Sequence, residues 1–331
     1  MPDSRLSELA DAFDGQPIAL VSCLSFEERS LTVANRLASG GLRRWVCLVN
    51  EDIETDIADM RAKALEIGAS AGIEVEFLPA SKRDPLRLAD TLVELAGNQS
   101  ADGGIRWVAD ITTMTHEMVL MTVAAAEEII AGWSDMTVVY NVAGQYSGSD
   151  APKDKWVSRG IHEVRSVIGY PGSWSPGEQT TLIAIPGFDP ERMHRIVEEI
   201  EPDRLIVGIA CPVGEHHSWS EEKNRRIAAQ LLSTRKGTTF DFPALDPMGA
   251  VKAIIDATAD VRNNVLLAPL NSKISTLALG VLARCRPEWQ VCYAPALIYN
   301  VSYATASDSV IMCSLADLRT EIARLLPAVH A

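Results

Sequence analysis

Residues 105–118 read Ile105-Arg-Trp-Val-Ala-Asp-Ile-Thr-Thr-Met-Thr-His-Glu-Met118. The short apolar run 107–109 ends at Asp110, which is typical of a buried strand. Glu117 opens a second apolar run that continues to Ala126 and predicts a helix. A strand that ends in an acid and hydroxyls and turns directly into a helix is a common ligand site of open α/β sheets, because the first N–H groups of the helix attract anions. Alternatively, Asp110 or Thr112 serves only as the N-cap of that helix.

Strand-like and helix-like segments alternate on both sides of this junction. A stretch rich in Gly and Pro, 145–179, separates two such series. Strands are predicted at 17–24, 44–50, 73–78, 107–110 and 136–141, and again at 181–185, 205–210, 238–242, 265–268 and 289–293. Helices are expected between them, with a lead-in helix at 5–13 and an acidic one at 51–70. The pattern predicts two Rossmann-like, doubly wound, mostly parallel sheets in domains 1–175 and 176–331.

The two series also match in their residues. Ser25-Phe-Glu27 corresponds to Gly187-Phe-Asp189, and Asp84-Pro85 to Asp246-Pro247, both at an offset of 162 positions. Tyr140-Asn141 corresponds to Tyr299-Asn300 at an offset of 159, which also carries the 107–118 junction onto the segment 266–277. These matches predict a tandem duplication, arranged as a pseudo-twofold pair whose ligand edges face one cleft.

Composition excludes several classes of function. With 30 Lys and Arg against 44 Asp and Glu, the net charge is −14, which disfavours binding to duplex nucleic acid. No apolar run is long enough to span a membrane and no secretory signal is present, so a cytoplasmic location is expected. The six cysteines form no C-x-x-C pair and are expected to be small buried hydrophobes.

No motif for a cofactor or a metal is visible, and none is expected. The chain lacks G-x-G-x-x-G, P-loop, G-x-S-x-G and H-E-x-x-H patterns. Glu215-His216-His217 invites a zinc site, but adjacent side chains point apart. A loop over the cleft, with either histidine as an acid or base, is the preferred interpretation.

The segment Asp110-Ile-Thr-Thr-Met-Thr-His-Glu-Met118 resembles the signature of the CRISPR-associated Rossmann-fold (CARF) sensors. In that family a strand ends in an acid or Asn and is followed by Leu/Ile-Thr-Gly-Gly-Thr-Lys, with a Met two residues on. Thr113 and Met114 replace the two glycines, and His116 stands where the family has Lys. In the second copy, 269–276, the chain keeps hydroxyls and a lysine, but at the 159 offset Lys273 falls opposite Met114.

The resemblance implies a sensor of cyclic or linear oligoadenylate, sometimes with slow cleavage of the ring. No nuclease or helix-turn-helix effector is visible, which implies a separate effector protein. Thr115 and His116 are the catalytic candidates if the ring is cleaved, although His116 also fits a surface residue in the first turn of a helix. The candidate ligand-binding residues are Ser25, Arg29, Asp110, Thr112, Thr113, Tyr140, Asn141, Asn271, Ser272, Lys273 and Asn300.

Three hypotheses follow from these observations. The first is a protein that binds a cyclic oligonucleotide or a related nucleotide second messenger in defence signalling. The second is an enzyme of the same cleft, either a phosphodiesterase (ring nuclease) or a nucleotide-dependent transferase. The third is an interaction subunit whose pockets no longer bind a ligand.

Overall fold

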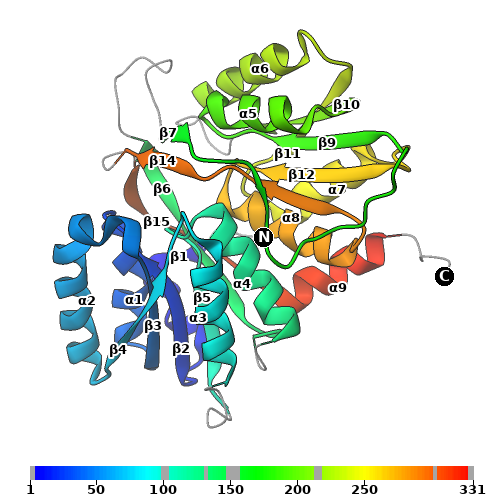
Figure 1. Ribbon diagram of the computed structural model, residues 1–331. Coiled ribbons are helices and arrows are strands. Elements are labelled where there is room, and N and C mark those ends of the chain that lie inside the picture. Colours follow the sequence, from blue (N-terminus) through cyan, green and yellow to red (C-terminus); the bar gives the residue numbers. More distant parts are fainter. Residues whose placement is uncertain are drawn as a thin grey trace. The chain divides into compact units, whose positions relative to one another are not determined.

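A computed structural model describes residues 4–97, 104–129, 133–146, 157–211, 218–300 and 304–326 (Figure 1). The chain forms two compact units. The first comprises residues 1–147 and 304–316, and the second comprises 148–303 and 317–331. Within the described ranges, no helix has both the length and the apolar character needed to cross a bilayer.

The first unit contains a seven-stranded sheet in the order β1-β15-β6-β5-β2-β3-β4. The five strands from β6 to β4 in this order are parallel, and they alternate along the chain with helices α1 to α4 (Figure 1). The strands are β1 (Ser4–Arg5), β2 (Ile18–Leu24), β3 (Leu42–Asn50), β4 (Val75–Ala80), β5 (Arg106–Asp110), β6 (Thr137–Tyr146) and β15 (Ala304–Ser314). The helices are α1 (Arg29–Ala38), α2 (Ala58–Ala71), α3 (Pro85–Gly97) and α4 (His116–Glu128), with the 3-10 helices η1 (Leu6–Glu8), η2 (Asp11–Phe13) and η3 (Glu51–Ile57).

Helices cover both faces of this sheet, which explains its unbroken apolar strands. All seven residues of β2 are buried, as expected for a central strand that faces helices on both sides. Helix α1 packs beside α2, and α3 packs beside α4. The chain leaves β2 for β3 in one direction and later places β5 on the other side of β2. The topological switch point of the sheet therefore lies between β2 and β5, where open α/β sheets bind their ligands at the carboxyl ends of the strands.

The second unit repeats this order. Its six-stranded sheet runs β11-β10-β9-β12-β13-β8, with its switch point between β9 and β12. The strands are β8 (Arg165–Ser166), β9 (Thr180–Ile185), β10 (Arg204–Cys211), β11 (Gly237–Pro243), β12 (Asn264–Pro269) and β13 (Gln290–Tyr293). The helices are α5 (Pro190–Ile200), α6 (Ser218–Leu232), α7 (Pro247–Ala257) and α8 (Lys273–Cys285), and a final helix α9 (Leu315–Leu325) follows β15. Strands β7 (Ser158–Ile161) and β14 (Ala296–Tyr299) form a separate two-stranded sheet.

The antiparallel edge strands are exchanged along the chain. Strand β15, which follows the whole second series, pairs with β6 in the first sheet. Strands β7 and β8, which follow β6, pair with β14 and β13 of the second unit. The division therefore differs from the expected domains 1–175 and 176–331. The reason is that strand pairing depends on distant partners, which neither the Gly- and Pro-rich segment 145–179 nor the repeated order of strands and helices reveals.

The predicted tandem duplication of a Rossmann-like fold is confirmed, because the five parallel strands of each sheet have the same order. The expected helices at 5–13 and 51–70 were wrong in detail: the first is two short 3-10 helices, and the second begins as η3. The match of Tyr140 to Tyr299 was also wrong. Tyr140 lies on β6, the fifth parallel strand, whose counterpart in the second sheet is β13, whereas Tyr299 lies on β14 outside that sheet.

Candidate functional site

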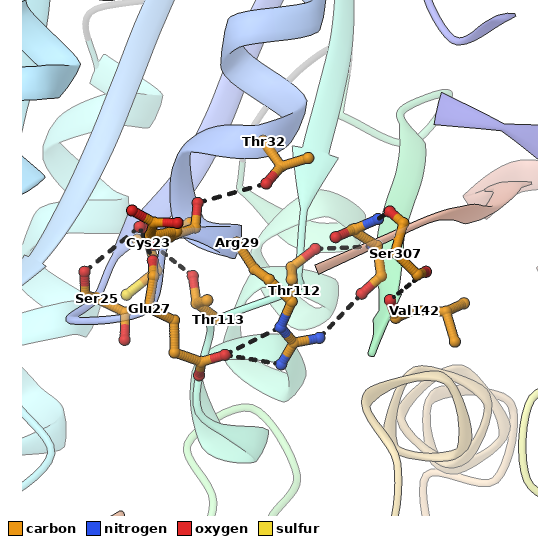
Figure 2. Close-up of polar contacts among 12 residues, drawn as sticks. Cys23, Ser25, Glu27, Arg29, Thr32, Thr112, Thr113, Val142 and Ser307 are labelled. Carbon is orange, nitrogen blue, oxygen red and sulfur yellow. Dashed lines mark hydrogen bonds and ion pairs between the residues drawn. The ribbon is translucent and has the colours of Figure 1, made fainter. Parts of the chain in front are cut away.

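The carboxyl ends of β2 and β5 meet at the switch point of the first unit. Ser25 closes β2 and is buried, and its carbonyl accepts a hydrogen bond from Ser30 Oγ at 3.4 Å. Thr113, in the β5–α4 loop, donates from Oγ1 to the Cys23 carbonyl at 2.6 Å (Figure 2). This bond holds the β5–α4 loop against the end of β2, so both loops form one edge.

The N-cap of α4 is Thr115, not Asp110 or Thr112 as the alternative interpretation proposed. Thr115 Oγ1 accepts a hydrogen bond from the Met118 amide at 3.1 Å. His116 is the first residue of the helix and is 7 % exposed, which rules out the surface histidine considered from sequence. Thr115 itself is half-buried. The edge therefore presents a capped helix start next to a buried imidazole.

A buried ion pair lies at the start of α1. The Arg29 guanidinium donates to Glu27 Oε2 from Nε at 3.0 Å and from Nη2 at 2.8 Å. Its Nη1 donates to the Asn141 carbonyl at 3.1 Å, so Arg29 bridges the β2–α1 loop and β6 (Figure 2). Both side chains are almost completely buried, and removing one partner of such a pair typically costs roughly 3–5 kcal/mol. Arg29 lies at the predicted edge, with its charge already balanced by Glu27.

Asp110 is the buried acid at the end of β5. Its Oδ1 accepts hydrogen bonds from the Thr112 amide at 3.0 Å and from the Thr112 hydroxyl. Burial raises the pKa of Asp110 to about 6, although the two Thr112 bonds and the charge of Arg29 lower it. Its second oxygen, Oδ2, is buried without a hydrogen-bond partner. The carboxyl group can therefore hold a proton near neutral pH and has one free position for a donor.

Asn141 links this network to the exchanged strand β15. Its backbone N–H donates to Thr112 Oγ1 at 2.9 Å, and its side-chain Nδ2 donates to the backbone carbonyls of Ser307 and Ser309 at 2.8 and 3.1 Å. Asn141 Oδ1 is buried without a partner, as is Ser309 Oγ. Sequence analysis missed the two serines, because they follow β14 in the chain and no local pattern places them beside β6. Tyr140 is buried, so its ring offers no open face for stacking.

The second unit brings Asn271, Ser272 and Lys273 to its own switch point. Ser272 is the N-cap of α8 and forms a capping box with Ser275. Its hydroxyl donates to the Ala244 carbonyl at 2.5 Å, and Asn271 Nδ2 donates to the Pro186 carbonyl at 2.8 Å. Both side chains thus stabilise local loops. Since α8 begins at Lys273 and α4 begins at His116, Lys273 occupies the helix position of His116, and the sequence offset that placed it opposite Met114 was wrong.

Asn300 does not join this site. It follows β14, and its amide donates to the Val157 carbonyl at 2.9 Å, so it extends the small β7–β14 sheet. The residue is therefore no counterpart of Asn141. The pair His216 and His217, with Glu215, lies outside the described residues. Across the part of the chain that the structure describes, no group of three or more His, Cys, Asp or Glu side chains fits a metal ion.

One buried arginine of the second unit escaped sequence analysis. Arg192, in the first turn of α5, donates from Nε to the Ala294 carbonyl at 2.8 Å, and its guanidinium carbon lies 5.1 Å from the centre of the Tyr293 ring. The residue is 5 % exposed, and its Nη2 has no hydrogen-bond partner. Its position in the repeat could have indicated it. Arg29 lies three residues after Phe26, and Arg192 lies four residues after Phe188, the phenylalanine that matches Phe26.

Comparisons with known proteins do not identify a family. No family model matches the chain, and no curated protein matches it. Among solved structures, the chain is similar to the crystal structure of the cytoplasmic domain of a prokaryotic cation chloride cotransporter, with 8 % identity over 85 % of this chain and 96 % of that chain, at a TM-score of 0.22. At that TM-score the likeness bears on neither fold nor function, and the site itself supports the following proposal.

Proposed function

We propose that the protein binds a nucleotide second messenger, a cyclic oligonucleotide of the oligoadenylate type, and acts as a sensor in bacterial defence signalling. The observation that supports this most is the switch-point edge of the first unit. There, the start of α4 and the half-buried Thr113 and Thr115 adjoin Asp110 and Asn141, two buried side chains that each have an oxygen without a partner. Helix starts favour anions, and unpartnered acceptors favour a ligand that carries N–H groups.

A nucleotide supplies both kinds of group. Its phosphates suit the N-terminal N–H groups of α4, and the amino groups of its bases suit the free acceptors of Asp110 and Asn141. Lys273 at the start of α8 adds further support, since it stands at the helix position where the CARF signature has its lysine. That the two edges share one cleft, with a pseudo-twofold relation, stays a prediction.

The alternative is an enzyme that opens the bound ring. His116 beside Thr115, together with a carboxyl group whose pKa is raised to about 6 in Asp110, is a set of groups that could move protons near neutral pH. Analysis of the products formed when the protein is incubated with cyclic oligoadenylates separates a sensor from a ring nuclease. Linear products that disappear in Thr115→Ala and His116→Ala would favour the enzyme.

Isothermal titration calorimetry against cyclic tri-, tetra- and hexa-adenylate, linear oligoadenylate, cyclic dinucleotides and ATP tests the proposal. We expect at least one cyclic oligoadenylate to bind. Thr113→Val releases the β5–α4 loop from the Cys23 carbonyl, and should weaken this binding about tenfold or more, which corresponds to ~1.4 kcal/mol.

Thr91→Val is the matched control. Thr91 Oγ1 also donates to backbone carbonyls, that of Pro79 at 2.6 Å and that of Arg87 at 3.0 Å, but Thr91 lies on α3 beside the edge strand β4. The two variants lose the same kind of bond, so they should be destabilised alike, and only Thr113→Val should lose affinity. If no phosphorylated ligand binds to the unmodified protein, the proposal fails and the interaction subunit becomes the better hypothesis.

A further inference from the structure

The two units differ in how they balance the charge of their equivalent arginines. Arg29 and Arg192 each lie in the first turn of the helix that follows the first parallel strand of their unit. Arg29 donates to the carbonyl of Asn141 within β6, and Arg192 to that of Ala294, directly after β13. Arg29 also makes two hydrogen bonds to Glu27. No described carboxylate forms an ion pair or a hydrogen bond with Arg192, and its Nη2 has no partner. The second unit thus contains a buried cation that lacks a bonded counter-ion.

The nearby carboxylates are bonded elsewhere. Asp189, which occupies the repeat position of Glu27, accepts hydrogen bonds from the Val157 and Ser158 amides at 3.2 and 2.7 Å and from Ser158 Oγ at 2.6 Å. Glu191 accepts one from the Gly160 amide at 3.1 Å. Both acids are therefore tied to β7 or to the residue before it. Asp189 is also the N-cap residue of α5, yet its side chain makes no capping bond.

Two cations and two carboxylates, Asp189 and Glu191, lie at the start of α5. Burial lowers the pKa of Arg192, but Tyr293, Tyr299 and Asp189 raise it by more, so the guanidinium remains protonated. A second cation, Lys223, lies over the ring of Phe188 in the β9–α5 loop, 5.9 Å from its centre. The uncapped helix start adds a partial positive charge. A buried guanidinium without a hydrogen-bonded anion is costly, because arginine cannot lose its proton instead.

From this asymmetry, we infer that the second unit contains an anion site in which Arg192 binds a phosphate group through Nη2. Guanidinium groups favour oxyanions, and Nη2 is the nitrogen of Arg192 that has no hydrogen-bond partner for its protons. Nη2 is shielded from solvent, so an anion reaches it only when neighbouring side chains move aside. The inference deepens the proposed function. It rests on that function for the identity of the anion as a nucleotide phosphate, and it adds a phosphate-binding side chain in the second unit to the helix start of α4 in the first.

Inorganic phosphate is the first probe. Thermal unfolding is followed in HEPES buffer without phosphate or sulfate, with phosphate or an equal ionic strength of chloride added. The unmodified protein should be stabilised by phosphate more than by chloride, and Arg192→Gln should lose that difference. Arg192→Lys keeps the positive charge but loses the planar guanidinium, so it should retain only part of the extra stabilisation by phosphate. This variant replaces Arg192→Gln in the test if Arg192→Gln does not fold.

Arg284→Gln is the matched control in the same unit. Arg284 also donates to a backbone carbonyl, that of Gly169, at 2.7 Å, and lies 5.9 Å from the centre of a tyrosine ring, Tyr170. This variant should keep the response to phosphate. The inference is overturned if phosphate gives no more stabilisation than chloride, or if Arg192→Gln and Arg284→Gln respond alike.

Nucleotide titrations then separate this inference from the proposed function. If a cyclic oligoadenylate binds Arg192→Gln with unchanged affinity, the anion site is wrong and the sensor proposal stands. If no nucleotide binds any variant but phosphate still stabilises the protein through Arg192, the anion site stands and the nucleotide is the wrong ligand.

Discussion

Asp110 is a buried carboxyl group whose protonation should set a pH dependence of stability. Burial raises its pKa from 3.8 to about 6, so the folded protein holds this proton more tightly than the unfolded chain does. Stability from this group should therefore be highest below pH 4, fall as the pH rises through the window from about 4 to 6, and stay constant above it. A shift of this size corresponds to roughly 3 kcal/mol.

Asp110→Asn should remove this fall. The amide oxygen can still accept from Thr112, and the side chain is neutral at every pH. In urea unfolding between pH 4 and 7, the free energy of unfolding of the variant should increase relative to that of the unmodified protein as the pH rises. Asp135→Asn, at an exposed position, is the control and should run parallel to the unmodified protein. If the Asp110→Asn curve is also parallel, Asp110 is ionised in the folded state across this range.

At the residue scale, sequence predicted positions better than roles. Arg29, Asp110, Thr112 and Asn141 do come together at one edge, because parallel strands bring their carboxyl ends together. Their partners were not predictable. Glu27 and Asp189 occupy matching positions in the sequence, yet Glu27 forms an ion pair with Arg29, whereas Asp189 accepts hydrogen bonds from backbone amides at the start of β7. The sequence alone does not distinguish these two outcomes, because they depend on side-chain geometry.

The close approach of two loops makes Gly187 essential to the second switch point. A Cβ at this position would lie 2.1 Å from the Leu270 carbonyl oxygen, a backbone atom that cannot turn away. Gly187→Ala should therefore force the β9–α5 and β12–α8 loops apart, at a cost of about 1–3 kcal/mol. Chemical denaturation measures that cost.

Gly97→Ala is the control for this prediction. Gly97 ends α3, and a Cβ added there would meet nothing within 4 Å, so alanine should be neutral or slightly stabilising. Equal effects of the two substitutions would mean that the loops do not touch. Since the loops hold Asn271 and the start of α5, Gly187→Ala should also weaken any response to phosphate.

Elements with strong local signals were predicted well. Pro85 and Pro247 begin α3 and α7, and the preceding Asp84 and Asp246 accept from the amides of Leu86 and Met248, as expected for Pro in the first turn. Elements without such signals were misplaced. The acidic stretch 51–57 forms a 3-10 helix, and β14 was matched to β6 although it pairs with β7. Both errors concern segments whose structure is set by what packs beside them.

The exchange of edge strands is the feature of the whole molecule that local sequence patterns could not show. Periodicity predicted the parallel series in each unit, because each strand there is followed by its own helix. It also indicated a strand at 309–313, within β15, but not the partner of that strand. Strand β15 lies 158 residues beyond β6, counted between the paired residues Tyr146 and Ala304. The sheet of the first unit therefore depends on a strand from the far end of the chain.

This dependence predicts how the chain behaves when it is cut. A fragment 1–151 contains β1 to β6 but lacks β15, so the hydrogen-bonding edge of β6 from Thr137 to Tyr146 loses its antiparallel partner. An uncovered edge of this length favours aggregation. The fragment should therefore be unfolded or aggregated alone, and should regain a cooperative transition when mixed with fragment 152–331, which carries β15. Circular dichroism and size-exclusion chromatography of the separate and mixed fragments measure this.

A fragment 1–147 extended through a short Gly-Ser linker by residues 304–316 is the control, since it restores β15 in one chain and should fold by itself. If fragment 1–151 folds alone as a stable monomer, β15 is dispensable and the two units are independent along the chain.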